Sequence, residues 1–100
     1  MRIMEEKLTF TLFTPHCKFP SVECDSVKLS IADSISGEFS GSYGIRKGHA
    51  KAVFALAPGR ISVSLDGREI FSAESQGGFA VVENNEVRVT ADGVQENVML

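Results

Sequence analysis

Four side chains in this sequence are of types that bind metals or act as nucleophiles: His16, Cys17, Cys24 and His49. Zinc sites use short ligand pairs such as Cys-x-x-Cys or His-x-x-x-His, and neither spacing occurs here. A Cys–His nucleophile needs the two side chains in contact and a third group that orients the histidine. We therefore expect no metal, no cofactor and no catalytic residue. We expect His16-Cys17 in a surface turn, Cys24 near a strand start, and both cysteines as reduced cytosolic thiols.

A cluster of glycines offers a second kind of chemistry. Gly37, Gly41, Gly44 and Gly48 surround the segment Phe39–Tyr43. Clustered backbone N–H groups can bind phosphate. However, neither a Gly-Lys-Ser/Thr signature nor a helix start follows, so we expect turn glycines between short strands. For His49, beside the last of these glycines, two interpretations stay open: a locally hydrogen-bonded group or a functional contact.

The elements that must position these residues are strands. Apolar and polar residues alternate with a period of two in four segments, which is typical of strands with one buried face. The segments are Leu8–Leu12, Val27–Ile31, Ile61–Leu65 and Val87–Thr90. We interpret the alanine-rich segment Ala50–Ala57 as a strand too, because Pro58-Gly59 ends it early and Val53-Phe54 favour a pleated surface.

Two hairpin turns are indicated between strands. Asp66-Gly67 and Asn84-Asn85 are residue pairs that tolerate positive φ, which a two-residue hairpin turn requires. Frequent turns between short strands predict an all-β fold, a flattened sandwich or barrel of roughly eight to ten mostly antiparallel strands. We expect one domain over residues 1–100, with a core over about 7–92 and a tail over 93–100.

The predicted core consists of the inward members of these strands. They are Leu8, Phe10, Leu12, Val27, Leu29, Ile31, Ile61, Val63, Phe79, Val81, Val87 and Val89, although the pattern leaves open which face of Phe79–Val82 points inward. Further apolar residues, notably Phe13, Phe54, Phe71 and Val82, exceed what one inner face needs. We expect some apolar residues to form a patch on an outer face.

Composition excludes some classes of function. The net charge is −3, whereas nucleic-acid binding usually needs a basic face. No apolar run is long enough to span a membrane, and the N-terminus lacks the apolar core of a secretory signal.

Several short segments of the sequence occur in an order that is typical of one protein family. They are Leu8–Thr14, Phe19-Pro20-Ser21, Val27–Ala32, Gly37-Glu38-Phe39 leading to Tyr43-Gly44-Ile45, Gly48-His49-Ala50, Pro58-Gly59, Gly77-Gly78-Phe79 and Val87–Asp92. In this order and near this spacing they resemble the N-terminal β-sandwich domain of the epsilon subunit of F-type ATP synthase. The resemblance runs from about Leu8 to Asp92. Lys47 departs from it, because the family often has proline before Gly-His-Ala, and the loop around Phe39–Tyr43 looks longer than usual.

The resemblance implies a non-catalytic subunit of the rotating central stalk. Such a subunit binds the gamma subunit and the c-ring, couples ion-driven rotation to ATP synthesis, and lies peripherally on the cytoplasmic face of the cell membrane. Matching positions place the c-ring contact at Glu38 and His49, with Tyr43 and Arg46 close by, in loops at one pole of the sandwich; the gamma contact is not assigned. The alternative is a divergent β-sandwich interaction domain with another partner.

The family's C-terminal helical hairpin, which regulates ATP hydrolysis, has no counterpart in these residues. We therefore expect neither ATP binding nor inhibition by a helical hairpin from this sequence.

Overall fold

The computed structural model describes residues 7–33, 35–36 and 38–97, and these form ten strands and no helix. The strands are β1 (Leu8–Phe13), β2 (Val22–Cys24), β3 (Ser26–Ala32), β4 (Phe39–Arg46), β5 (Ala52–Leu56), β6 (Gly59–Leu65), β7 (Arg68–Ser75), β8 (Gly77–Glu83), β9 (Glu86–Asp92) and β10 (Gln95–Asn97). The all-β expectation is confirmed, as is a strand within Ala50–Ala57. Within the expected tail, Gln95–Asn97 forms β10 on the edge of β7.

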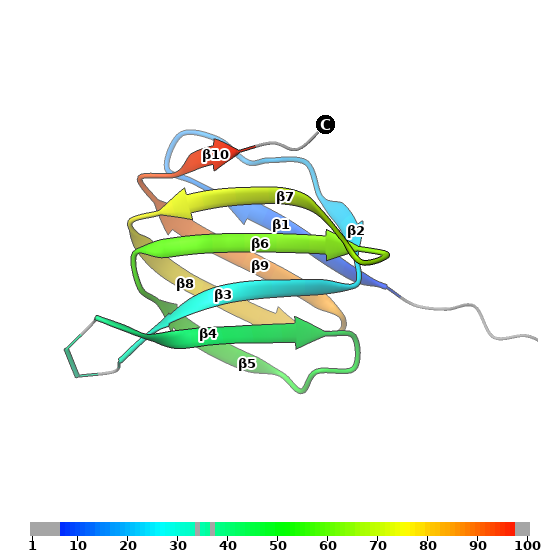
Figure 1. The fold of residues 1–100 in the computed structure, drawn as a ribbon, viewed down its shortest axis with the longest axis horizontal. Coiled ribbons are helices and arrows are strands. Elements are labelled where there is room, and N and C mark those ends of the chain that lie inside the picture. The colour runs from blue at the N-terminus through cyan, green and yellow to red at the C-terminus, as the bar shows by residue number, and fades with distance from the viewer. Residues whose placement is uncertain (1–6, 34, 37, 98–100) are drawn as a thin grey trace, which may run out of the picture.

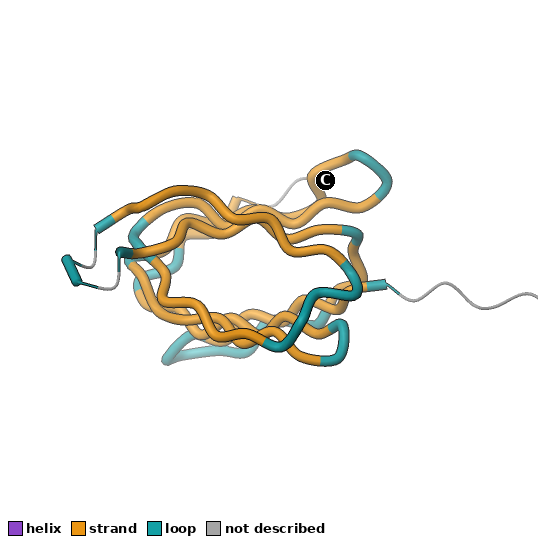
Figure 2. Tube along the Cα trace, turned by 90° about the horizontal axis from the view of Figure 1, so that it is seen from below, coloured by secondary structure: helices purple, strands orange, loops and turns teal. Residues whose placement is uncertain are grey.

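The strands form one sheet that folds over into two layers. The order is β10-β7-β6-β3-β5-β8-β9-β1-β2, with β4 paired to the remaining edge of β3. Figure 1 shows β7, β6, β3 and β4 in front of β5, β8, β9 and β1, and Figure 2 shows the two layers edge-on. Neighbours pair antiparallel except β1 and β9, which are parallel. The result is a flattened, mostly antiparallel sandwich.

Inward-facing side chains from both layers fill the space between them. Nine of the residues predicted for the core are buried: Leu8, Phe10, Leu12, Val27, Leu29, Ile61, Val63, Val87 and Val89. Ile31 is half-buried and packs against this cluster. On β8 the inward residues are Ala80 and Val82, so the expectation that Phe79 and Val81 belong to the core is wrong. Both faces of β8 are apolar, and its smaller alanine points inward.

Both predicted hairpin turns are confirmed. Asp66 and Gly67 have φ of 53° and 78°, and Asn84 and Asn85 have φ of 52° and 59°. Positive φ at both central residues makes each a type I′ turn, whose twist matches that of the flanking strands. These turns fix the register of β6 with β7 and of β8 with β9.

The β6–β7 turn is also held from outside by Asp25. Its carboxylate accepts a 2.6 Å hydrogen bond from the backbone N–H of Asp66, and Lys7 lies 3.4 Å from its other oxygen. The Asp66 hydrogen bond first, and Lys7 after it, hold the pKa of Asp25 below its usual value. The ionised carboxylate therefore ties the hairpin to the segment between β2 and β3.

Candidate functional site

The turn after β4 is held by a neighbouring turn. The backbone N–H of Gly48, whose φ of 83° is uncommon for a residue with a side chain, donates a 2.7 Å hydrogen bond to Oδ1 of Asn85. The backbone N–H of His49 donates to the carbonyl oxygen of Arg46 at 3.2 Å. The β4–β5 turn is therefore fixed both by its own backbone and by the β8–β9 hairpin.

His49 has hydrogen-bond partners at both ring nitrogens. Nδ1 lies 2.6 Å from the carbonyl oxygen of Ala50, and Nε2 lies 2.8 Å from the hydroxyl oxygen of Tyr43. Because a carbonyl oxygen only accepts, Nδ1 carries the proton of the neutral imidazole, and the hydroxyl of Tyr43 donates to Nε2. The sequence left open whether His49 was locally hydrogen-bonded or functional; the structure shows the local bonds.

The ring of Phe54 completes an aromatic cluster with Tyr43 and His49. The Phe54 centroid lies 4.9 Å from that of Tyr43 and 6.1 Å from that of His49, and the Tyr43 and His49 centroids are 5.6 Å apart. These separations suit favourable ring contacts. The sequence analysis gave Phe54 no place at this site. The available signal was the two-residue spacing between Phe54 and Leu56. Residues two apart on a strand point to the same face, so Phe54 shares the inward face of the buried Leu56.

Glu38 does not lie with the other three candidate residues. Residues 39–46 form β4, so Glu38 precedes the strand while Arg46 ends it and His49 lies in the turn beyond. At about 3.3 Å per residue, the two ends of this segment are roughly 25 Å apart. The expectation that all four residues lie in loops at one pole is therefore wrong. In Figure 1 the segment before β4 and the turn after it lie at opposite ends of the sandwich.

The glycines of this segment also differ from expectation. Gly41 and Gly44 lie inside β4, paired with Ile31 and Lys28 of β3, whereas Gly48 is in the turn. Gly37 lies outside the described residues. Ile45 is fully buried opposite Val27 and anchors this segment, which is rich in glycine and serine, to β3.

A second feature is an apolar area on the outside of β5 and β8. Val53 lies directly opposite Val81, and Ala55 opposite Phe79, so all four side chains share the outer surface. Val53 is 67% exposed and Phe79 is 49% exposed. We call these four residues the β5–β8 outer face. The expectation of an outer apolar patch is confirmed, but with other members: Val82 is buried, and Phe54 and Phe71 pack against the core.

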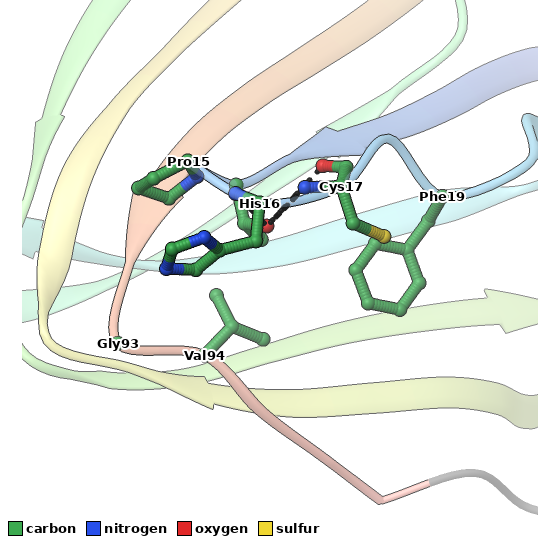
Figure 3. Close-up of a pocket in the computed structure, with 7 residues that line it drawn as sticks. Pro15, His16, Cys17, Phe19, Gly93 and Val94 are labelled. Atoms are coloured by element: carbon green, nitrogen blue, oxygen red, sulfur yellow. Dashed lines mark hydrogen bonds between the residues drawn. The ribbon is translucent and has the colours of Figure 1, made fainter.

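His16 and Cys17 lie where the chain turns after β1, at the wall of a shallow apolar cavity. The cavity has a volume of about 350 Å³ and is lined by Thr14, Pro15, His16, Cys17, Phe19, Gly93 and Val94. Figure 3 shows His16 and Phe19 on one side and Gly93–Val94 on the other. Oγ1 of Thr14 accepts hydrogen bonds from the backbone N–H groups of His16 and Cys17, which explains the turn. The predicted surface turn is confirmed.

Cys24, on β2, is buried among the core residues and away from that turn, and both cysteines are free. Within the described part of the chain, no three His, Cys, Asp or Glu side chains are grouped closely enough to hold a metal ion. In the same residues, no helix is long and apolar enough to cross a membrane.

The two thiols are expected to differ in reactivity. Burial, and next the charge of Asp25, raise the pKa of Cys24 to about 11, so at pH 8 it is a protonated and shielded thiol. Cys17 is exposed. Ellman's reagent should therefore titrate one thiol in the native chain at pH 8 and both after denaturation. A Cys17→Ser variant should show no fast-reacting thiol; a fast reaction in that variant would show that Cys24 is accessible.

Comparisons with known proteins agree on one family. The family model described as "ATP synthase, Delta/Epsilon chain, beta-sandwich domain" matches residues 7–97. The ATP synthase epsilon chain of Anaeromyxobacter sp. (strain K) is 38% identical over 85 residues, which are 85% of this chain and 58% of that relative. That of Prochloron didemni is 35% identical over 88 residues, 88% of this chain and 59% of the relative. The chain thus spans less than two thirds of the length of these relatives.

Two solved structures share the fold. A chain of the Tetrahymena thermophila mitochondrial ATP synthase central stalk and c-ring superposes with a TM-score of 0.67 at 15% identity, covering 93% of this chain and 69% of that one. A chain from the Euglena gracilis mitochondrial ATP synthase OSCP/F1/c-ring assembly gives a TM-score of 0.74 at 20% identity, covering 95% of this chain and 56% of that one. At these identities the likeness concerns the fold alone.

Proposed function

The chain belongs to the family of ATP synthase delta/epsilon β-sandwich domains, and from that premise we propose that it serves as a non-catalytic part of the rotor stalk. An epsilon chain is a structural or regulatory subunit rather than a catalytic one. In this proposal the domain binds the gamma subunit and the c-ring, and thereby couples ion-driven rotation to ATP synthesis. It lies at the cytoplasmic face of the membrane as a peripheral component.

The observation that carries the proposal is the β5–β8 outer face. A permanent contact between subunits removes apolar surface from water at its centre. Val53 and Phe79 supply such surface on two paired strands, which hold it rigid. We assign the gamma contact to this face.

We assign the ring contact to the β4–β5 turn, at Arg46 and His49. Arg46 is exposed at the end of β4, and His49 follows the turn at 47–48, half-buried and with its backbone N–H bonded to Arg46. Tyr43 would act through His49, because its hydroxyl is already hydrogen-bonded to the imidazole. Glu38, at the opposite end of β4, falls outside this contact.

These two proposed contacts are joined by one strand. The β4–β5 turn ends at residue 51, and β5 begins at Ala52 and carries Val53 and Ala55 of the outer face. β5 pairs with β8 over its whole length. A force applied at the turn therefore reaches the outer face through hydrogen-bonded strands rather than through a loop, which suits transmission of torque.

The test is reconstitution with the partner subunits of the same organism. We expect the purified chain to co-elute with gamma in size-exclusion chromatography, and to join a larger complex when detergent-solubilised c-ring is added. An unrelated β-sandwich protein of similar size serves as the control. Failure to bind gamma, with or without the ring, would contradict the proposal and favour a different partner.

A further inference from the structure

The β4–β5 turn concentrates positive charge. Arg46, Lys47 and Lys51 fall within six residues, together with His49, and no acidic residue lies among them. We call residues 46–51 the basic turn. The chain as a whole has a net charge of −3, so the charge of this turn is opposite in sign to that of the whole chain.

The described residues neutralise this charge only in part. Lys51 lies 3.9 Å from a carboxylate oxygen of Glu83, at the limit of an ion pair, and its side chain is 73% exposed. In residues 7–33, 35–36 and 38–97, neither Arg46 nor Lys47 forms an ion pair with a carboxylate. Both side chains belong to exposed residues. The charge of Arg46 also acts on Asp25, whose pKa it helps to lower, so the least compensated positive charge of the turn is that of Lys47.

The turn also presents its charges in a fixed arrangement. The hydrogen bond from Gly48 to Asn85 and the one from His49 to Arg46 order the backbone before any partner binds. Such preorganisation lowers the entropic cost of association. Because both ring nitrogens of His49 are already hydrogen-bonded, the lysine and arginine side chains, rather than the imidazole, are available to pair with an anion.

We propose that the basic turn binds an acidic polypeptide loop of the partner on which it rests. This inference rests on the proposed function, which places the ring at this turn, and adds that the ring loop carries carboxylates facing Arg46 and Lys47. Each such pair at an accessible surface fixes orientation and speeds association more than it adds affinity.

An anionic membrane or a nucleic acid fits this surface less well. Recognition of anionic lipid usually needs four to eight clustered basic residues, roughly, more than the turn offers. The neighbouring β8–β9 hairpin carries Glu83 and Glu86, which lie 3.9 Å and 3.7 Å from Arg88, so the surface beside the turn is of mixed charge rather than uniformly basic. A patch this small, on a chain of net negative charge, is suited to a local acidic loop that contacts the turn alone.

The test measures binding of the chain to immobilised c-ring, purified in detergent from the same organism, at low and high ionic strength. Lys47→Glu reverses one charge of the basic turn. Arg68→Glu is the matched control, because Arg68 is also exposed and lies beside a different hairpin turn. We expect Lys47→Glu to weaken binding by roughly tenfold at low salt and to reduce its salt dependence, and Arg68→Glu to leave both unchanged.

A ring variant that exchanges its loop carboxylate for lysine should restore the affinity of the Lys47→Glu chain. Ring binding that Lys47→Glu leaves unchanged or strengthens overturns this inference and leaves the proposed function standing. So does a ring loop without any Asp or Glu. Binding to phosphatidylglycerol vesicles, but not phosphatidylcholine vesicles, that is lost in Lys47→Glu overturns it in favour of lipid. Absence of ring binding at every ionic strength overturns the ring contact itself.

Discussion

Replacing Gly78 with alanine is expected to lower the free energy of unfolding by roughly 2–3 kcal/mol. Gly78 has a φ of 142°, in a region that residues with a side chain rarely adopt. A Cβ built there would lie 2.0 Å from the carbonyl oxygen of Thr90 and 2.8 Å from Cα of Ala91. Both obstacles are backbone atoms of the paired strand β9, so relief requires separating β8 from β9 rather than turning a side chain.

Gly44→Ala is the matched control for this prediction. Gly44 lies inside β4, without a positive φ, and an added Cβ would meet no atom within 4 Å. Thermal unfolding followed by circular dichroism should show Gly78→Ala melting roughly 10–20 °C below the parent, with Gly44→Ala close to it. Equal melting temperatures for the two variants would show that β8 and β9 accommodate the extra methyl group.

The sequence predicted those parts of the fold whose signals are local. Asp66-Gly67 and Asn84-Asn85 specify their turns because few residues tolerate two successive positive φ values. Gly78 is a case that the sequence did not decide: its close approach to the backbone of Thr90, which leaves no room for a Cβ, is seen only in the structure. Alternation of apolar and polar residues is also a local signal. It located the inner faces of β1, β3, β6 and β9 because the other face of each of these strands is mostly polar.

The parts that were missed depend on tertiary contacts. The segment Phe39–Arg46 shows little alternation, and its strand structure comes from pairing with β3 and from the burial of one residue, Ile45. The sequence analysis expected this segment to form loops, which would have left Glu38 and Arg46 close together. Because the segment is an extended strand, the two residues lie at its opposite ends, and the candidate site is not at one pole. The aromatic cluster of Tyr43, His49 and Phe54 was missed for the same reason, because these residues come from β4, the turn and β5 and meet only in the folded chain.

The sequence could not decide which face of β8 points inward, and the reason lies in its composition. Phe79-Ala80-Val81-Val82 is apolar on both faces, so periodicity could not choose between them. In the structure one face is core and the other is the β5–β8 outer face. A strand that is apolar on both faces therefore supplies the core with one face and leaves apolar side chains on the outer surface with the other, which is the surface that we propose as a contact.

That surface leads to the prediction with the largest expected effect on binding. Phe79→Lys should weaken association with the gamma subunit at least about thirtyfold, because it removes a central aromatic side chain and places an unpaired charge in a desolvated contact. Phe79 is 49% exposed and points away from the core, so the domain should remain folded. Val53→Lys, at a side chain that is 67% exposed on the paired strand, should have the same direction of effect.

Ile35→Lys separates a specific contact from a general effect of surface charge. Ile35 is the most exposed large apolar residue of the described chain, at 94%, and lies in the segment before β4, outside the four residues of the outer face. The same substitution there should leave gamma binding within about twofold of the parent, since isolated exposed apolar residues carry little binding energy. Titration by calorimetry, with melting temperatures measured alongside, distinguishes the cases. If Phe79→Lys and Val53→Lys stay folded and bind gamma as tightly as Ile35→Lys does, the gamma contact lies on another surface. In that case β5, which joins the β4–β5 turn to the outer face, does not transmit the torque.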